Sequence, residues 1–145
     1  MREFKFRAWD GEARRMYSPE DLEQPEIKDD TKKTIYGYLS FGVLYIYDFK
    51  GKEPVELVPM QFTGWYDKKQ NEIYEGDIVN IEGVNYEVIW SEESAAFMLQ
   101  ADRTTAMGGE YLNDVAEVVG NIYENPEYLE NPEYSNFQQE KQNVL

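Results

Sequence analysis

The sequence predicts an all-β protein with minor helical turns, arranged as a small barrel or roll. Short runs of β-branched and aromatic residues recur at spacings of roughly ten to twenty residues, which favours such a fold. Glycine-containing turn signals separate these runs. The chain has 145 residues, of which 41% are hydrophobic, and it contains 12 Tyr, 7 Phe and 3 Trp. This composition supplies a core without any disulfide.

The N-terminal segment, residues 1–50, is predicted to be a β-hairpin and strand subdomain. Apolar and polar residues alternate over 4–9, and the Asp-Gly pair at 10–11 is a strong hairpin turn signal. Ser-Pro-Glu-Asp at 18–21 is typical of the start of a short helix, with serine as the N-cap and proline at the first position. The polar residues 25–34 predict an exposed loop.

Residues 35–49 are rich in tyrosine and aliphatic residues, which predicts β-structure. Gly37 and Gly42 interrupt the run, so one long strand with a bulge and two shorter strands both fit the pattern. Residues 55–58 begin another short strand. Pro59 indicates that this strand lies at the edge of its sheet, because proline donates no backbone hydrogen bond.

Residues 51–129 are predicted to hold the core of the barrel. The best-ordered pattern is a hairpin whose two strands are joined around 82–85. A Gly-Gly pair at 108–109 marks a loop between the last two strands. The four strand patterns lie at 78–81, 86–90, 96–99 and 116–119.

The C-terminal tail contains an internal repeat, because Glu-Asn-Pro-Glu-Tyr at 124–128 recurs at 130–134. Each copy has the pattern of a helix start, with asparagine as the cap and proline at the first position. Two short helical turns explain the repeat, and a docking tail is the alternative. Residues 130–145 are predicted to be a polar tail that is partly helical or frayed.

The net charge of −15 is unevenly distributed along the chain. Residues 1–50 carry nine Lys or Arg against ten Asp or Glu, whereas residues 51–145 carry five against nineteen. Such an acidic surface repels phosphate, so direct nucleic-acid binding is not expected. The excess of acid is explained either by solubility or by a surface that imitates nucleic acid and docks on a basic partner.

The residue inventory argues against catalysis, metal binding and cofactors. There is no histidine and no cysteine, which removes the commonest general base, a thiol nucleophile and the usual zinc ligands. No glycine-rich phosphate loop is present. The acids between Asp67 and Asp77 lack the spacing of a calcium loop and are interpreted as a solvated turn. We therefore predict no catalytic residue, metal ligand or cofactor, and we expect the protein not to be an enzyme.

The protein is expected to be cytoplasmic and not associated with a membrane. No apolar run approaches the roughly 20 residues of a membrane span. Met1 leads into charged residues, and the apolar core of a signal peptide does not follow it.

Aromatic residues supply the candidates for partner binding. On strands they usually pack into the core, whereas exposed ones line peptide-binding grooves. Five are singled out as candidates, and these are Trp9, Trp65, Tyr66, Tyr74 and Tyr123.

Three separated stretches, in this order, resemble the YopX family of phage and prophage proteins. They are FRAWD at 6–10 with MY at 16–17, MQFTGWYDK at 60–68 continuing as EIYEGDIV at 72–79, and VGNIYENPE at 119–127. The resemblance spans residues 1–129. Trp65 stands where the family usually has an aliphatic residue, and Asn71 where it often has glycine. Asparagine tolerates the left-handed conformation, so we expect the turn to survive.

The resemblance implies an all-β protein with an N-terminal β-hairpin subdomain and an SH3-type barrel in its carboxy-terminal part, encoded on a phage or an integrated prophage. The family is uncharacterised, so the resemblance implies no particular activity. Among the shared residues, Gly64 and Gly76 are expected to permit turns, and Asp77 to bind nearby backbone amides.

The leading hypothesis is a non-enzymatic protein-interaction module that binds a phage or host protein. One alternative is an acidic nucleic-acid mimic that inhibits a host DNA-binding or defence protein. Another is a carboxylate-dependent hydrolase, which requires two converging carboxylates in a cleft. Edge strands also leave a homo-oligomer open.

Overall fold

A computed structural model describes residues 3–102 and 104–130 and divides the chain into two compact units, Met1–Phe62 and Thr63–Leu145. The predicted mostly β architecture is confirmed. The described strands form two sheets and no closed barrel, so the SH3-type barrel is not confirmed.

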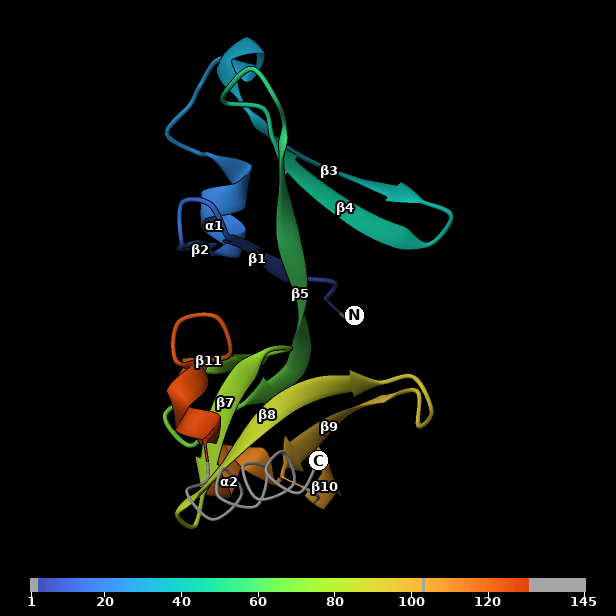
Figure 1. Ribbon diagram of the computed structural model, residues 1–145, viewed down its shortest axis with the longest axis vertical. Helices are drawn as coiled ribbons and strands as arrows, with labels where there is room; N and C mark the ends of the chain where they lie inside the picture. Colours follow the sequence, from blue (N-terminus) through green and yellow to red (C-terminus); the bar gives the residue numbers. More distant parts are fainter. Residues whose placement is uncertain (1–2, 103, 131–145) are drawn as a thin grey trace, which may run out of the picture. The chain divides into compact units, whose positions relative to one another are not determined.

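The first unit is built on an antiparallel sheet whose strand order is β2-β1-β5-β4-β3 (Figure 1). Its hairpin β3–β4 extends away from β1 and β2, and β3 lies at one edge of the sheet. The strands are β1 (Phe6–Asp10), β2 (Arg15–Tyr17), β3 (Ile35–Ser40), β4 (Val43–Asp48) and β5 (Val55–Tyr66).

Local signals in the sequence place the first elements correctly. The turn after Asp10 joins β1 to β2, and Ser18 caps helix α1 (Pro19–Glu23). The hydroxyl of Ser18 accepts from the amide of Asp21, whose carboxylate accepts from the amide of Ser18, which is a complete capping box. The predicted loop that follows contains a short 3-10 helix, η1 (Asp30–Lys32).

The run from residue 35 to 49 is two strands and not one. Gly42 has a φ of 83° and forms the turn of the β3–β4 hairpin, whereas Gly37 sits inside β3 opposite Ile46. The two glycines look alike in the sequence, but only Gly42 occupies a conformation that favours glycine.

Strand β5 is central, so the prediction that Pro59 marks an edge strand is wrong. Its residues pair with β4 at Val55–Leu57 and with β1 from Val58 onward. The amide of Phe62 donates to the carbonyl of Lys5 (2.8 Å), and the alternation of an antiparallel ladder then turns the nitrogen of Pro59 away from β1. Because β4 no longer pairs at that point, no donor is needed there.

The core of the first unit lies beneath one face of its sheet. Residues that alternate along the strands supply it, which is the period-two pattern of a half-buried sheet. Leu22 of α1 packs against the same cluster. The buried members are Ala8, Tyr17, Ile35, Ile46 and Leu57.

The second unit contains an antiparallel sheet of order β10-β9-β8-β7-β11. The short strand β6 (Glu72–Tyr74) pairs with the end of β5. The remaining elements are β7 (Asp77–Ile81), β8 (Val84–Ser91), β9 (Ala96–Ala101), β10 (Thr104–Met107), α2 (Leu112–Val115), β11 (Glu117–Asn121) and the 3-10 helix η2 (Pro126–Leu129).

The predicted hairpin around residues 82–85 is confirmed as a two-residue turn between β7 and β8. Glu82 and Gly83 have φ values of 50° and 85°, as a type I′ turn requires at both positions. Beneath the sheet lies a core in which the largest side chains are fully buried, and its members are Ile73, Val79, Val88, Leu99, Leu112 and Ala116.

One boundary and two elements differ from the prediction. The division between the units falls after Phe62 and not after residue 50, because β5 completes the first sheet. Strand β10 and helix α2 were not predicted. The first copy of the tail repeat forms η2, and the second copy lies outside the described residues.

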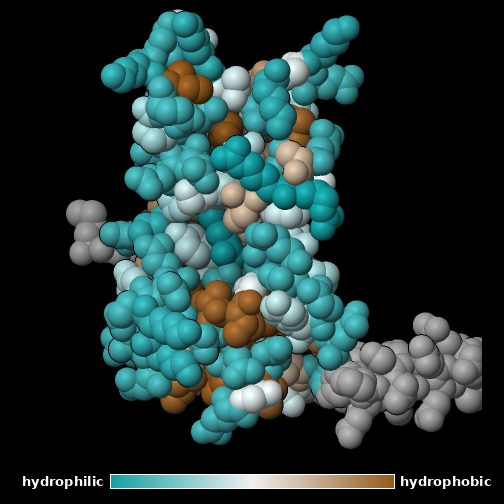
Figure 2. Space-filling model, turned by 90° about the vertical axis from the view of Figure 1, so that its left-hand side faces the viewer, coloured by the Kyte–Doolittle hydropathy of each residue, from teal (hydrophilic) through white to brown (hydrophobic). Residues whose placement is uncertain are grey.

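Polar residues cover most of the side of the protein drawn in Figure 2, where hydrophobic residues gather in small groups. Among the described residues, no helix has the length and apolar character needed to span a membrane.

Candidate docking surfaces

The first candidate surface is the outward side of the β3–β4 hairpin, here called the aromatic face. Side chains alternate across a strand, so the register of the hairpin brings every second residue of both strands to this side. Tyr36 lies opposite Tyr47, and Tyr38 lies opposite Tyr45. Phe49 continues the face just beyond the end of β4.

Three rings of the aromatic face, those of Tyr38, Tyr45 and Tyr47, lie nearly parallel to one another. The ring centroids of Tyr38 and Tyr45 are 5.5 Å apart, and those of Tyr38 and Tyr47 are 6.1 Å apart, with interplanar angles of 21° and 14°. Tyr47 also contacts Phe49 at 6.1 Å in a tilted arrangement. Such pairs stabilise a hairpin by a few tenths of a kcal/mol to about 1 kcal/mol each. The face is thus ordered by its own ring contacts.

The tip of the same hairpin carries an exposed apolar side chain. Phe41 and Gly42 are the two central residues of a type I′ turn, with φ values of 49° and 83°. Positive φ is unfavourable for a bulky residue such as Phe41, and its side chain is fully exposed. Leu39 is exposed as well. A strained backbone therefore presents an apolar ring to solvent at this tip.

One carboxylate, that of Glu56, borders the aromatic face. Burial by its neighbours raises the pKa of Tyr47, and the carboxylate of Glu56, which lies opposite on β5, raises it further. The hydroxyl of Tyr36 donates to the carbonyl of Asp30 (3.3 Å). No Lys, Arg, Asp or Glu is a member of the face itself, so its own side chains carry no formal charge.

The second candidate surface is a groove in the second unit, here called the aromatic groove. Its volume is about 540 Å³. Its aromatic walls come from the end of β5 and from the loop before α2. The lining includes Trp65, Tyr66, Tyr111, Gln70, Glu110 and Asp114.

Trp65 is the fixed element of the aromatic groove. Its ring meets Phe97 edge-on, with centroids 6.2 Å apart, and packs against the core of the unit. Gly108 lies directly against the indole, where a Cβ would collide with the ring. A glycine is needed at 108 because the indole approaches the backbone so closely.

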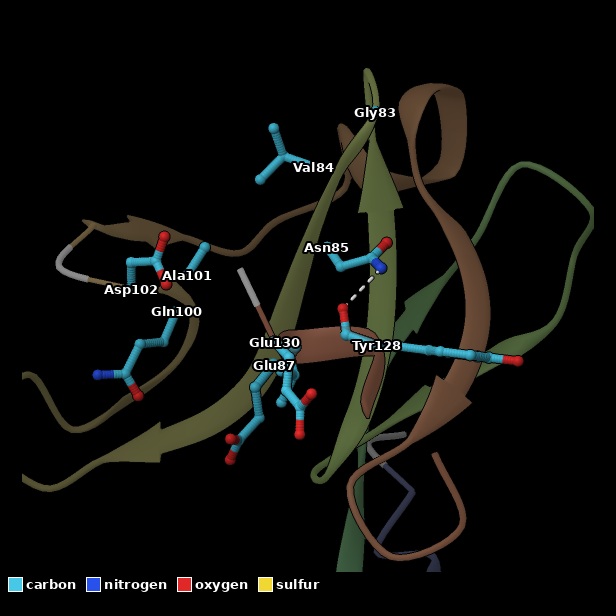
Figure 3. Close-up of a pocket in the computed structure, with 10 residues that line it drawn as sticks. Gly83, Val84, Asn85, Glu87, Gln100, Ala101, Asp102, Tyr128 and Glu130 are labelled. Atoms are coloured by element: carbon cyan, nitrogen blue, oxygen red, sulfur yellow. Dashed lines mark hydrogen bonds between the residues drawn. The ribbon is translucent and has the colours of Figure 1, made fainter. Parts of the chain in front are cut away.

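A third hollow, of about 450 Å³, lies between η2 and strands β8 and β9 (Figure 3). The side-chain amide of Asn85 donates to the carbonyl of Tyr128 (2.8 Å) and ties η2 to β8. Glu87, Asp102 and Glu130 line it. Burial raises the pKa of Glu87.

The five sequence-predicted candidates are not brought together. Trp65 and the 41%-exposed Tyr66 line the aromatic groove. Trp9 and Tyr74 are only 5% and 6% exposed, so the prediction that they bind a partner at the surface is not supported. Tyr123 is half-buried after β11 and does not line the groove.

The acids between Asp67 and Asp77 have a structural role that the solvated-turn interpretation missed. Asp67 is fully buried and accepts the amides of Lys69, Asn71 and Val118 at 2.8–2.9 Å, together with the side-chain amide of Asn71. Burial alone would raise the pKa of Asp67, but these donors outweigh it and hold the pKa below its ordinary value. As expected, Asp77 accepts a backbone amide, that of Tyr74.

The turn after Asp67 also differs in detail from the prediction. Gln70, with a φ of 66°, takes the left-handed conformation that was expected at Asn71. Asn71 instead contributes its amides to the Asp67 carboxylate. Within the described residues, no group of three or more His, Cys, Asp or Glu side chains is placed to hold a metal ion.

The fold and these surfaces define a mostly β protein of two units with exposed aromatic residues in each. The YopX protein family matches residues 5–130, and the chain belongs to this family. Among solved structures, it is similar to protein EF1440 from Enterococcus faecalis, with a TM-score of 0.58 and 26% sequence identity over 90% of this chain and 100% of that chain. No curated protein matches the sequence.

The aromatic face was missed because its signal is spread over two strands. Tyr36, Tyr38, Tyr45 and Tyr47 alternate in the sequence. Alternation alone places Tyr36 and Tyr38 on one side of β3, and Tyr45 and Tyr47 on one side of β4. Only the register of the hairpin, fixed by the turn at Gly42, shows that both sets share one side and that this side is exposed.

Proposed function

We propose that the protein is a non-enzymatic protein-interaction module, carried by a phage or prophage, whose docking surface is the aromatic face with its Phe41 tip. The observation that carries the proposal is the set of stacked tyrosine rings on the β3–β4 hairpin. Tyr36 and Tyr38 are exposed, and Tyr45 and Tyr47 are half-buried. Exposed aromatic side chains are enriched where proteins bind one another, and they tend to contribute most of the binding energy.

The strained tip supports the same proposal. A phenylalanine at positive φ costs free energy, and asparagine or glycine would relieve that cost. Its ring makes no contribution to the described core. We infer that the side chain is kept for an apolar partner protein, which would bury Phe41 together with the tyrosine rings.

Affinity capture from a bacterial host lysate tests the proposal. The tagged full chain is washed at low salt and then at about 1 M salt, where charge contacts are screened. An apolar docking surface retains its partner through the second wash, and Phe41→Ser should abolish that retention. Phe4→Ser is the matched control, since Phe4 is also exposed but lies outside the hairpin.

Two results would contradict the proposal. Equal recovery of the same partner by F41S and by the unsubstituted chain would exclude the tip. Elution of a basic nucleic-acid-binding protein as the salt rises would favour the nucleic-acid mimic instead, because the acidic residues would then supply the contacts.

A further inference from the structure

The aromatic groove carries an inference that is independent of the aromatic face. Two of its rings present large areas to solvent, since Tyr66 and Tyr111 are 41% and 45% exposed. The third ring, that of Trp65, is half-buried and held by Phe97 and Gly108. The groove therefore offers aromatic surface in a fixed position, which lowers the entropy lost when a ligand binds.

Polar contacts hold the two sides of the aromatic groove together. The side-chain amide of Gln70, in the turn after β5, donates to the side-chain carbonyl of Asn113 in α2 (2.8 Å). The hydroxyl of Tyr111 donates to the carbonyl of Met107. The Tyr111 ring is thereby fastened to the loop that carries it, and the groove is formed before any ligand arrives.

Two carboxylates beside the rings are not neutralised. Glu110 and Asp114 are exposed, and neither side chain forms an ion pair or hydrogen bond with any residue of 3–102 or 104–130. The neighbouring lysines are engaged elsewhere, since Lys69 contacts Glu117 at 2.6 Å and Lys68 contacts it at 3.8 Å. Within its described lining, the groove holds two negative charges and no positive one.

Aromatic rings next to carboxylates match the chemistry of one side chain in particular. The guanidinium of arginine is planar, stacks on aromatic faces and donates to carboxylates through several N–H groups at once. An acidic or phosphate-bearing ligand would meet repulsion here, because residues 63–145 carry four basic against seventeen acidic residues. Charge complementarity thus selects a cationic ligand.

We propose that the aromatic groove binds an arginine side chain on an extended segment of a partner protein. The guanidinium lies against the rings of Tyr66 and Tyr111 and donates to Glu110 and Asp114. The indole of Trp65 borders the site and reports its occupation.

The probe is a capped Gly-Arg-Gly peptide, titrated into the ¹⁵N-labelled full chain and followed by NMR. Its matched partner is the same peptide with citrulline, which keeps the shape of arginine and removes its charge. We expect a saturable shift of the Trp65 indole N–H signal with the arginine peptide only, and weaker binding as salt rises. Equal shifts with both peptides, or no shift of this signal, would overturn the proposal.

Two variants locate the binding. E110Q combined with D114N should weaken the arginine peptide about fivefold, as expected for loss of two solvent-exposed charge pairs. Tyr66→Leu should also weaken it, whereas Tyr128→Leu, an equally exposed tyrosine outside this groove, should not. Unchanged affinity in the double variant, with its NMR spectrum otherwise preserved, would exclude the groove. Failure of the F41S capture experiment would leave this result unaffected.

Discussion

The two units use different groups to stabilise a buried aspartate. Each buries an aspartate completely beside a tight turn, Asp10 at the end of β1 and Asp67 directly after β5. Asp10 accepts two backbone amides, at 3.0 Å each, and the ammonium of Lys50 at 3.2 Å. Asp67 accepts three backbone amides and one side-chain amide, without any cation among the described residues.

The comparison teaches how a buried carboxylate is kept ionised. In both cases burial opposes the charge, and hydrogen bonds outweigh it, so the pKa lies below the ordinary value of 3.8. In the first unit part of the compensation is an ion pair with a half-exposed lysine. In the second unit it comes from amides fixed by the turn and by β11, so Asp67 joins two segments that are 51 residues apart.

The largest expected effect is that of Asp67→Ala. Four donors would lose their acceptor, and each buried donor left unsatisfied costs about 1–3 kcal/mol. We expect the free energy of unfolding to fall by about 3 kcal/mol or more, measured by urea denaturation.

Asp10→Ala provides the comparison for this variant. It removes the acceptor of fewer donors, so a smaller loss is expected. Hydrogen exchange should rise around residues 67–71 and 118 in D67A, and around residues 10–13 in D10A. Equal and uniform loss of protection in both variants would contradict the local role assigned to each aspartate.

The acid dependence of stability is the second expected effect. Because the folded-state pKa of both aspartates is lowered, their contribution is fully present above the unfolded value near 3.8 and is lost as pH falls through the folded pKa. Each carboxylate should then remove up to about 1.4 kcal/mol per pH unit. Asp67→Asn should flatten this decline below about pH 4. If D67N shows the same slope of unfolding free energy against pH as the unsubstituted chain, the lowered pKa of Asp67 does not contribute to acid sensitivity.

The smallest expected effect is a gain. Phe41→Asn places a residue that tolerates positive φ in the type I′ turn, so the unfolding free energy should rise by about 0.5–1 kcal/mol. Leu39→Asn, at an exposed strand position of the same hairpin, should bring no such gain. If F41N is no more stable than the unsubstituted chain, the tip is not strained, and the argument that its side chain is kept for binding loses its support.

The sequence predicted elements whose signals are local. The capping box at Ser18 and the turn at Gly83 depend on neighbouring residues only, and both were placed correctly. The prediction that Pro59 marks an edge strand was wrong because a proline can also stand in a central strand where the neighbouring strand no longer pairs. Where β4 stops pairing with β5 cannot be seen in the residues around Pro59. Strand β10 was missed because Thr-Thr-Ala-Met has little apolar alternation and acquires its pairing from β9.

The candidate surfaces were predicted less well for the same reason. Trp65 and Tyr66 were singled out by residue type and do share a groove, but type alone did not separate them from the buried Trp9 and Tyr74. The exposure of an aromatic residue depends on which side of a sheet the core occupies. The carboxylates of the aromatic groove come from α2 and the loop before it, more than forty residues further along the chain.

The pairing of β1 with β5 has a consequence for synthesis on the ribosome. Residues 6–9 pair with residues 58–61, so β1 must wait for roughly fifty more residues to be made before its partner exists. Until then the hairpin β1–β2 is a two-stranded element, which is marginally stable in water. The β7, β8, β9 and β10 ladder, by contrast, grows by successive hairpins as each strand emerges. The sheet of the first unit is thus completed only when β5 has left the exit tunnel.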